Sequence, residues 1–244
     1  MSYFESRLRV DFEDRKEVYR IIKFCEKLNI SNLILEPLNN SKNFQDDIFR
    51  EIMENSKLNI YYRLNLSPRN SNQFKNELRH YNKFPYIISL ETPEKEIQIQ
   101  AAKDSRVDVL SYSNPVNMKT ATSGVISLAK QNGTFIEFSL APIMEKNKGL
   151  QSKNLRLIYR FIQLILRIKP KLIISGNFDT LYNLRHPRNL CIVCHTLFGL
   201  PLDKAKIAFS KNVEMLLQQV STRKENKLIH PGVRSIKGEN TYER

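Results

Sequence analysis

The sequence of 244 residues has no tryptophan, only three cysteines and only seven glycines. Three cysteines are too few for the disulfide framework that holds small secreted folds together. None of the glycines falls into a Gly-x-Gly-x-x-Gly pattern, so the sequence offers no glycine-rich loop for a nucleotide phosphate. Apolar runs of about 18 residues, which a membrane span requires, are absent, and residues 1–5 lack the basic and apolar start of a secretory signal. We therefore expect a cytoplasmic protein that does not contact a membrane.

Seven short β-rich runs alternate with amphipathic helical stretches. The runs are residues 4–10, 32–36, 58–66, 86–91, 107–111, 135–140 and 172–175. Strand–helix units in series imply parallel strands joined by crossovers, and this many consecutive units overfill the usual open sheet. The sequence therefore predicts an α/β fold, a TIM-like (βα) barrel that is irregular or incomplete, with about seven parallel strands. A doubly wound open sheet is the alternative.

The C-terminal part of the chain departs from this repeat. No eighth strand follows, and residues 187–220 have a helical pattern throughout, which predicts extra C-terminal helices. Residues 221–244 are polar, basic and poor in periodic apolar residues. We expect residues 1–220 to form a single barrel domain and residues 221–244 to form a basic, flexible tail.

Histidine is scarce in positions where a barrel enzyme would need it. Metal-dependent barrel hydrolases typically carry a His-x-His pair at the end of the first strand. The first predicted strand contains no histidine, and the four histidines of the chain lie away from predicted strand ends. We expect the protein to bind no metal or other cofactor and to have no catalytic residues of its own.

Positive charge is concentrated in the C-terminal part of the chain, which carries most of the net charge of +14. Residues 1–145 contain 20 Lys and Arg against 19 Asp and Glu, whereas residues 146–244 contain 19 against 6. Between Lys146 and Leu202 the only acidic residue is Asp179. A concentrated positive field attracts phosphates, so this asymmetry favours a nucleic-acid partner. A basic surface that serves only solubility is the alternative.

The helical stretch at residues 155–168 combines a basic stripe with a broad apolar surface. Arg156 and Arg160 are one turn apart and lie on the same stripe as Gln163 and Arg167. Most of the remaining circumference is apolar, which is more than the inward face of an outer helix needs. We expect Arg156 and Arg160 to face RNA phosphates and the apolar flank around Ile158 and Ile165 to contact a protein partner.

Further candidate phosphate ligands follow this helix. Lys169 and Lys171 lie between it and the seventh strand, and Arg185 and Arg188 flank the start of the next helix. Free backbone N–H groups at a helix N-terminus favour anions, and arginine binds phosphate in a bidentate manner. We therefore add these four residues to the predicted RNA-binding set.

Several segments, taken in chain order, resemble those of one known family. They are Val-Asp-Val-Leu-Ser at 107–111, Phe-Ile-Glu-Phe-Ser-Leu at 135–140, Ile-Ile-Ser-Gly at 173–176, Leu-Arg-His-Pro-Arg at 184–188, Phe-Ser-Lys-Asn at 209–212 and Pro-Gly-Val-Arg at 231–234. In this order the sequence is similar to archaeal ribonuclease P protein component 3, the counterpart of a eukaryotic RNase P and MRP subunit. A Leu-Arg-x-Pro-Arg motif of that family matches Leu184, Arg185, Pro187 and Arg188, with His186 where a small residue is usual.

The resemblance implies a barrel-like fold that is related to metal-dependent barrel hydrolases but lacks their metal ligands. It also implies an RNA-binding role in ribonuclease P, together with protein component 2 and other proteins of the particle, on the catalytic domain of the RNase P RNA. That RNA uses Mg²⁺ to remove the 5′ leader from precursor tRNA, so the protein would meet precursor tRNA indirectly. The resemblance thus implies a subunit that supports RNA catalysis.

Two other functions remain open from the sequence. The first is a metal-independent or divergent barrel phosphodiesterase or hydrolase that uses Glu36 and Glu91, two carboxylates at the expected C-terminal rim. The second is a scaffold that binds only proteins.

Overall fold

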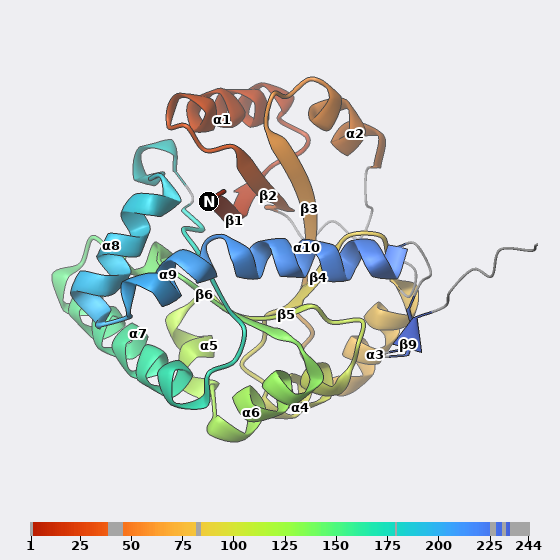
Figure 1. The fold of residues 1–244 in the computed structure, drawn as a ribbon, viewed down its shortest axis with the longest axis vertical. Coiled ribbons are helices and arrows are strands. Elements are labelled where there is room, and N and C mark those ends of the chain that lie inside the picture. The colour runs from red at the N-terminus through yellow and green to blue at the C-terminus, as the bar shows by residue number, and fades with distance from the viewer. Residues whose placement is uncertain are drawn as a thin grey trace, which may run out of the picture.

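A computed structural model describes residues 2–38, 46–81, 84–178, 180–224, 228–230 and 233–234. Seven parallel strands form a barrel with helices around it (Figure 1). The strands of the barrel are β1 (Phe4–Val10), β2 (Asn32–Pro37), β3 (Asn59–Leu66), β4 (Ile87–Leu90), β5 (Val109–Tyr112), β6 (Phe135–Ser139) and β7 (Leu172–Ser175). The helices are α1 (Arg15–Lys27), α2 (Asp46–Glu54), α3 (Ser71–His80), α4 (Lys95–Lys103), α5 (Pro115–Thr120), α6 (Ser123–Asn132), α7 (Lys148–Ile168), α8 (Pro187–Phe198), α9 (Leu202–Ala208) and α10 (Lys211–Lys224), with short 3-10 turns η1 (Ala141–Met144) and η2 (Leu181–Asn183).

The sheet follows the order of the chain from β1 to β7, and every neighbouring pair is parallel. Strands such as β2 and β6 are buried along their whole length, because the barrel interior covers one face and the outer helices cover the other. Each helix turns one apolar face inward, as α1 does with Val18, Ile22 and Cys25. The seven predicted strands and the predicted parallel order are confirmed, with small differences at the strand ends.

The seam between β1 and β7 makes the barrel irregular. Among the described residues no backbone ladder joins these two strands, and polar side chains bridge them instead. The Ser6 hydroxyl donates to the Ile174 carbonyl oxygen at 3.1 Å. The Gly176 N–H donates to Glu5 Oε1 at 2.9 Å. The predicted irregular barrel is therefore confirmed, and it is nearly closed.

Helix α10 covers the N-terminal end of the barrel (Figure 1). Its buried residues Val213, Leu216 and Val220 form a small apolar cluster with side chains from the starts of the strands. Those side chains are Phe4, Ile34, Ile87, Val109, Phe135 and Ile173. Just before the helix, the Phe209 carbonyl accepts the Phe4 N–H at 2.9 Å, so the start of β1 is joined to the segment between α9 and α10.

The end of α10 is fixed by one buried ion pair. Arg223 Nη1 lies 2.8 Å from Oδ1 of the fully buried Asp108, and Arg223 Nη2 also donates to the Tyr86 carbonyl at 2.8 Å. Burial raises the pKa of Asp108, and the Arg223 charge opposes that rise. Because α10 continues to Lys224, the predicted tail boundary at residue 221 is wrong: residues 221–224 belong to the folded domain.

Two short antiparallel strands, β8 (Leu228–His230) and β9 (Val233–Arg234), also fall within the predicted tail. Residues 235–244 lie outside the described residues. The predicted helical stretch at 187–220 is confirmed as α8, α9 and most of α10. Gly199, with φ 68°, adopts the left-handed conformation that ends α8.

We expect Arg223→Ala to lower the free energy of unfolding by about 3 kcal/mol, because it leaves the Asp108 carboxylate buried without its partner. Urea denaturation followed by circular dichroism measures this change. Lys211→Ala, at an exposed position at the start of the same helix, is the control and should change the free energy by less than about 0.5 kcal/mol. Equal stability of the two variants would show that the ion pair does not hold α10.

Candidate functional site

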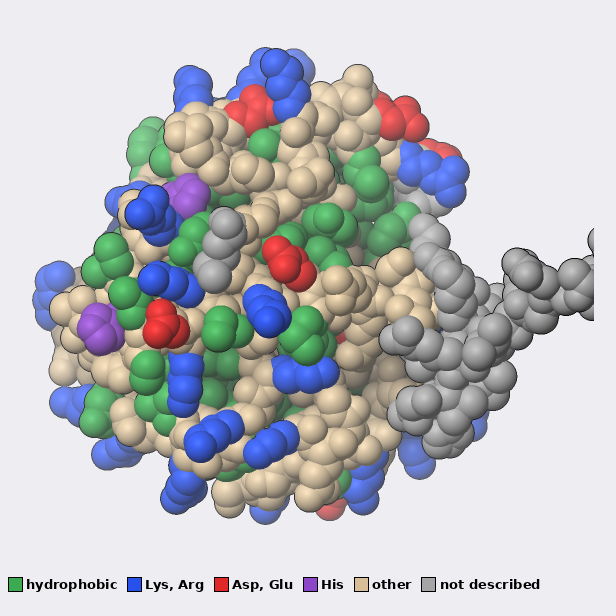
Figure 2. All heavy atoms as spheres, viewed as in Figure 1, with side chains coloured by type: hydrophobic (Ala, Val, Ile, Leu, Met, Phe, Trp, Pro, Cys, Tyr) green, Lys and Arg blue, Asp and Glu red, His purple; other side chains and the backbone are tan. Residues whose placement is uncertain are grey.

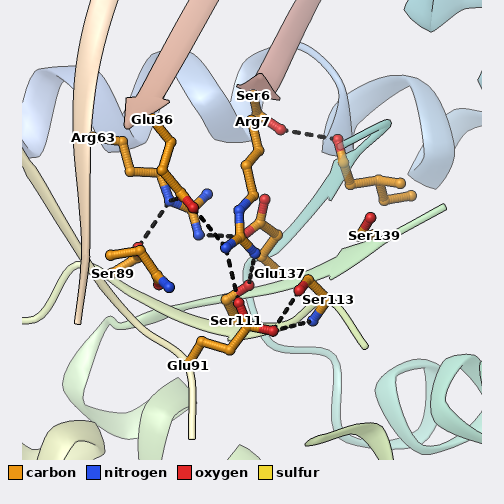
Figure 3. Close-up of polar contacts among 12 residues, drawn as sticks. Ser6, Arg7, Glu36, Arg63, Ser89, Glu91, Ser111, Ser113, Glu137 and Ser139 are labelled. Atoms are coloured by element: carbon orange, nitrogen blue, oxygen red, sulfur yellow. Dashed lines mark hydrogen bonds and ion pairs between the residues drawn. The ribbon is translucent and has the colours of Figure 1, made fainter. Parts of the chain in front are cut away.

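The interior of the barrel holds a network of arginines and glutamates instead of a purely apolar core (Figure 3). At its centre is Arg7 on β1, whose side chain is 0% exposed. Arg7 Nη2 donates to Glu36 Oε1 and to Glu91 Oε2, each at 2.8 Å, and Nη1 donates to the Ser111 hydroxyl at 2.9 Å. These contacts join β1 to β2, β5 and the end of β4.

A second buried arginine extends the network across the barrel. Arg63 on β3 donates through Nη2 to Glu137 of β6 and through Nε to the Ser89 hydroxyl at 2.8 Å. Its Nε also lies 3.2 Å from Glu36 Oε2. Glu36 therefore links the two buried arginines, Arg7 and Arg63.

The network reaches solvent at the C-terminal rim, where a barrel enzyme would hold its substrate. An open depression of about 680 Å³ is lined there by residues that include Arg9, Glu36, Glu91, Asn114 and Asn117. Arg9 Nε lies 3.3 Å from Glu36 Oε1, and Arg9 Nη2 lies 3.7 Å from Glu91 Oε2. Glu91 also accepts hydrogen bonds from the Ser113 hydroxyl and from Asn117 Nδ2, the latter at 3.0 Å.

The pKa shifts follow from this pairing. Burial alone would raise the pKa of Glu91, but the Arg7 charge and the hydrogen bond from Ser113 outweigh it and lower the pKa below its ordinary value. The pKa of Glu137 is lowered in the same way, since Arg63 and Arg7 outweigh its burial. Both carboxylates are held ionised by their arginine partners.

Glu5 differs from Glu91 and Glu137 in the direction of its pKa shift. Burial raises its pKa to about 8, although the N–H groups of Gly176 and Arg7 donate to it and oppose the rise. At neutral pH Glu5 is therefore mostly protonated. The remaining interior carboxylates, Glu36, Glu91 and Glu137, then match the three guanidinium groups of Arg7, Arg9 and Arg63.

The pairing of carboxylates with arginines determines which chemistry the rim can support. A general acid needs a raised pKa and access to substrate, but Glu91 has a lowered pKa and Glu5 is fully buried. Within the described residues, no three His, Cys, Asp or Glu side chains are grouped so as to hold a metal ion. Glu36 and Glu91, the pair on which the hydrolase alternative depends, are bound by arginines, so the geometry supports a structural role for both.

Helix α7 confirms part of the arrangement predicted from its sequence. Arg156 and Arg160 are exposed on its outer surface. Ile158 and Ile165, however, are 0% and 4% exposed and pack in the main core with Phe161. The predicted protein contact at these two isoleucines is therefore wrong, because the wide apolar face of α7 packs against the barrel and neighbouring helices. Although α7 is the longest helix described, no helix in the described part of the chain is long and apolar enough to cross a membrane.

The six predicted RNA-binding residues do not lie on one surface. Lys169 caps the C-terminal end of α7 in the left-handed conformation, with φ 59°. Lys171 is half-buried, and its Nζ lies 5.0 Å from the centre of the Phe135 ring at the start of β6. Both lysines therefore lie toward the N-terminal end of the barrel, whereas Arg185 and Arg188 follow the C-terminal end of β7.

The start of α8 differs from the anion site that its sequence suggests. Pro187 has no N–H, the Arg188 N–H donates to His186 Nδ1 at 3.0 Å, and the Asn189 N–H donates to the His186 carbonyl at 2.9 Å. The expected free N–H groups are therefore occupied, with His186 as the N-cap. The side chains of Arg185 and Arg188 are both exposed beside this N-terminus.

Sequence reasoning missed the Arg7–Arg63 network. The signal was present in β1, where Glu5, Arg7 and Arg9 alternate with apolar or small residues and therefore share one face of the strand. In a barrel, one face of every strand points to the interior. Parallel strands are usually apolar on both faces, so this pattern did not by itself indicate buried charges.

The molecular surface carries many more basic than acidic side chains on the face that α8, α9 and α10 form (Figure 2). This agrees with the excess of Lys and Arg in residues 146–244. Positive charge on the outside, and balanced charge inside, point to the outer surface as the place where a charged partner binds.

Comparison with known proteins identifies relatives over most of the chain. A family model described as RNase P subunit p30 matches residues 5–225. Ribonuclease P protein component 3 of Methanococcus maripaludis (strain C5 / ATCC BAA-1333) is 23% identical over 158 residues, which are 64% of this chain and 68% of that protein. A chain in a cryo-EM structure of archaeal ribonuclease P with mature tRNA has the same fold, with a TM-score of 0.78 and 19% identity over 97% of this chain and 99% of that one.

We expect the free energy of unfolding to fall as the pH rises from about 5 to 8, because the folded state keeps a proton on Glu5 that the unfolded chain releases above its ordinary pKa of 4.5. Glu5→Gln keeps an acceptor for the Gly176 N–H and lacks this proton. As the pH rises across that window, the free energy of unfolding of Glu5→Gln should therefore increase relative to that of the unmodified protein. The expected increase is a few kcal/mol, on the order of 1.4 kcal/mol for each unit by which burial raises the Glu5 pKa. Urea denaturation at several pH values tests this. The exposed Glu13→Gln is the control, and parallel stability curves for all three proteins would contradict a protonated Glu5.

Proposed function

The chain belongs to the RNase P subunit p30 family, whose model matches residues 5–225, and on this premise we propose that it is an RNA-binding, non-catalytic protein subunit of ribonuclease P. The match over nearly the whole described chain is the observation that carries the proposal. In such a particle the RNA, with Mg²⁺, removes the 5′ leader from precursor tRNA. The protein needs no cofactor of its own for this role.

The charged groups of the outer surface support an RNA partner. Arg156 and Arg160 on α7 and Arg188 at the start of α8 are exposed, and α7 and α8 pack against each other. Arg185 is exposed as well, but its Nη1 also donates to the carbonyls of Tyr182 and Leu184 at 2.6 and 2.8 Å. We assign the phosphate contacts chiefly to Arg156, Arg160 and Arg188. Arg185 contributes a further contact and also stabilises the turn at Tyr182–Leu184.

Lys169 and Lys171 have a lesser part in this proposal. They lie toward the other end of the barrel, and Lys171 packs over Phe135. A large folded RNA can contact both ends of a domain of this size, so the two lysines remain a second, separate contact. Their position predicts that they act independently of the arginines.

The proposed partners follow from the same premise. We infer that the protein binds the catalytic domain of the RNase P RNA together with protein component 2 and other RNase P proteins, and that it meets precursor tRNA only through them. A cytoplasmic location fits a partner RNA of this kind. A solved chain with the same fold comes from a structure of archaeal ribonuclease P with mature tRNA.

The direct test is to purify the tagged protein from its native cells and to sequence the RNA that travels with it. Enrichment of RNase P RNA, with precursor-tRNA cleavage in the eluate, is the expected result. A preparation that carries protein partners but no RNA would favour a protein-only scaffold. Metal-dependent hydrolysis of a generic phosphodiester by the isolated protein, abolished by Glu36→Gln, would favour a hydrolase.

We expect the triple variant Arg156→Glu, Arg160→Glu and Arg188→Glu to bind the recovered RNase P RNA more weakly, because it loses three phosphate contacts. The log–log dependence of affinity on salt should become less steep by roughly 2 to 3. Electrophoretic mobility shifts at several salt concentrations measure both changes.

The matched control for this variant reverses three exposed lysines beside or on α2 to α4. They are Lys57, Lys75 and Lys95. This control has the same net charge, so equal losses of affinity in the two triple variants would show that total charge, and not the α7–α8 surface, determines binding.

A further inference from the structure

A groove of about 700 Å³ lies between α1 and the η2 turn, outside the surface discussed above. One wall is a face of α1 and the other is formed by Leu181 and Tyr182. Figure 1 shows the turn that leads to α8 beside the end of α1. Basic side chains of α1 line the groove: Lys16, Arg20, Lys23 and Lys27.

These four cations form a single row. Their spacing of four, three and four residues places about one cation on each turn of the helix, or roughly one per 5.4 Å along its axis. All four are exposed. Glu17 and Glu26 of α1 flank the row, and Glu17 pairs with Arg20 at 3.3 Å. Neither glutamate is among the described residues that line the groove, so its lining has an excess of positive charge.

Aromatic side chains lie beside the cations in the same groove. Tyr19 and Phe24 of α1 are half-buried against the core. Tyr182, by contrast, is 83% exposed, which is the largest exposed fraction among the described large apolar side chains. An aromatic ring this exposed contributes little to the core, so its ring faces are available to a ligand.

The turn that carries Tyr182 is well braced. Arg185 donates to the Tyr182 and Leu184 carbonyls, and the Asn183 N–H donates to the Thr180 carbonyl at 3.1 Å. Leu184 is buried and anchors the turn to the core. The ring is therefore presented at the groove by an ordered segment, which reduces the entropy lost when a ligand stacks on it.

A second, smaller depression of about 250 Å³ extends the groove toward the barrel. It shares Arg20, Leu181 and Tyr182 with the groove and is also lined by Arg9 at the C-terminal rim. Tyr182 thus stands between the row of cations and the rim.

We propose that this groove binds an unpaired RNA strand, with a base stacked on Tyr182 and the strand's phosphates along Lys16, Arg20, Lys23 and Lys27. The inference rests on the proposed function in that it takes RNA as the partner, and it adds a site for single-stranded nucleotides. Stacking platforms beside a cationic track are how proteins hold single strands without reading a fixed sequence. A duplex keeps its bases stacked on one another, so it can use the cations but not the Tyr182 ring.

The test measures binding of the full-length protein to a labelled oligouridine of about ten nucleotides, and to a duplex of the same length, by fluorescence anisotropy. We expect Tyr182→Ala to weaken single-strand binding by about 5- to 100-fold, the loss of one base–aromatic stack, and to leave duplex binding unchanged. Tyr182→Phe keeps the ring and should retain binding. Because Tyr182 is exposed, neither change should affect folding.

A second pair of variants separates this track from general charge. Lys23→Glu with Lys27→Glu should weaken oligouridine binding and reduce its salt dependence, whereas Lys57→Glu with Lys75→Glu, of equal net charge, should not. Oligouridine binding that is indifferent to Tyr182→Ala would overturn the proposal. Polyglutamate binding as tight as that of the RNA, and equally sensitive to Tyr182→Ala, would overturn it in favour of an acidic protein segment.

The outcomes also distinguish this site from the proposed function. If the Arg156, Arg160 and Arg188 variant loses affinity for the recovered RNase P RNA while the groove variants bind oligouridine normally, the groove proposal fails and the proposed function stands. If oligouridine binding depends on Tyr182 but no RNase P RNA is bound, the groove proposal stands and the proposed function fails. A protein that binds neither RNA overturns both.

Discussion

Pairing of buried charge inside the barrel is the constraint on which the rest of the structure depends. An arginine in Arg7's position has no access to water, and an unpaired buried ion costs several kcal/mol, so its carboxylate partners must approach from different strands. The interior is also crowded beside Glu5. A Cβ at position 176 would lie 2.5 Å from Glu5 Oε2, so any residue other than glycine there would have to displace the Glu5 carboxylate. In a barrel built this way the rim carboxylates Glu36 and Glu91 hold strands together through their arginine partners.

Much of the fold was predictable from the sequence because the strand–helix repeat is regular and each apolar run is short. The seven strands, their parallel order and the C-terminal helices followed from local patterns alone. The end of the domain was not predictable, since Arg223 lies in a basic, weakly periodic segment and its significance depends on Asp108, far away in the chain. Local patterns report which residues are apolar, but they do not report which distant charge a residue will meet.

In the candidate site, too, some features could be predicted from the sequence and others could not. The sequence correctly predicted which arginines are exposed, because a charged side chain at the surface does not depend on a distant residue for a partner. They are Arg156, Arg160, Arg185 and Arg188. Burial of Ile158 and Ile165 did not, since the width of an apolar face does not tell whether the protein's own core or another chain covers it. The α1 groove was also beyond sequence reasoning. Its two walls, α1 and the η2 turn, are separated by most of the chain and become one surface only when the barrel closes.

The contact between Phe4 and Phe209 has a consequence for how the molecule is made. During synthesis β1 leaves the ribosome well before α10, yet the backbone acceptor for its Phe4 N–H is Phe209 and the helix that covers its end is α10. Until then the growing sheet has an open edge and an uncovered apolar end, the features that promote aggregation of folding intermediates. The N-terminal end of the barrel is therefore completed only once Phe209 and α10 have been synthesised.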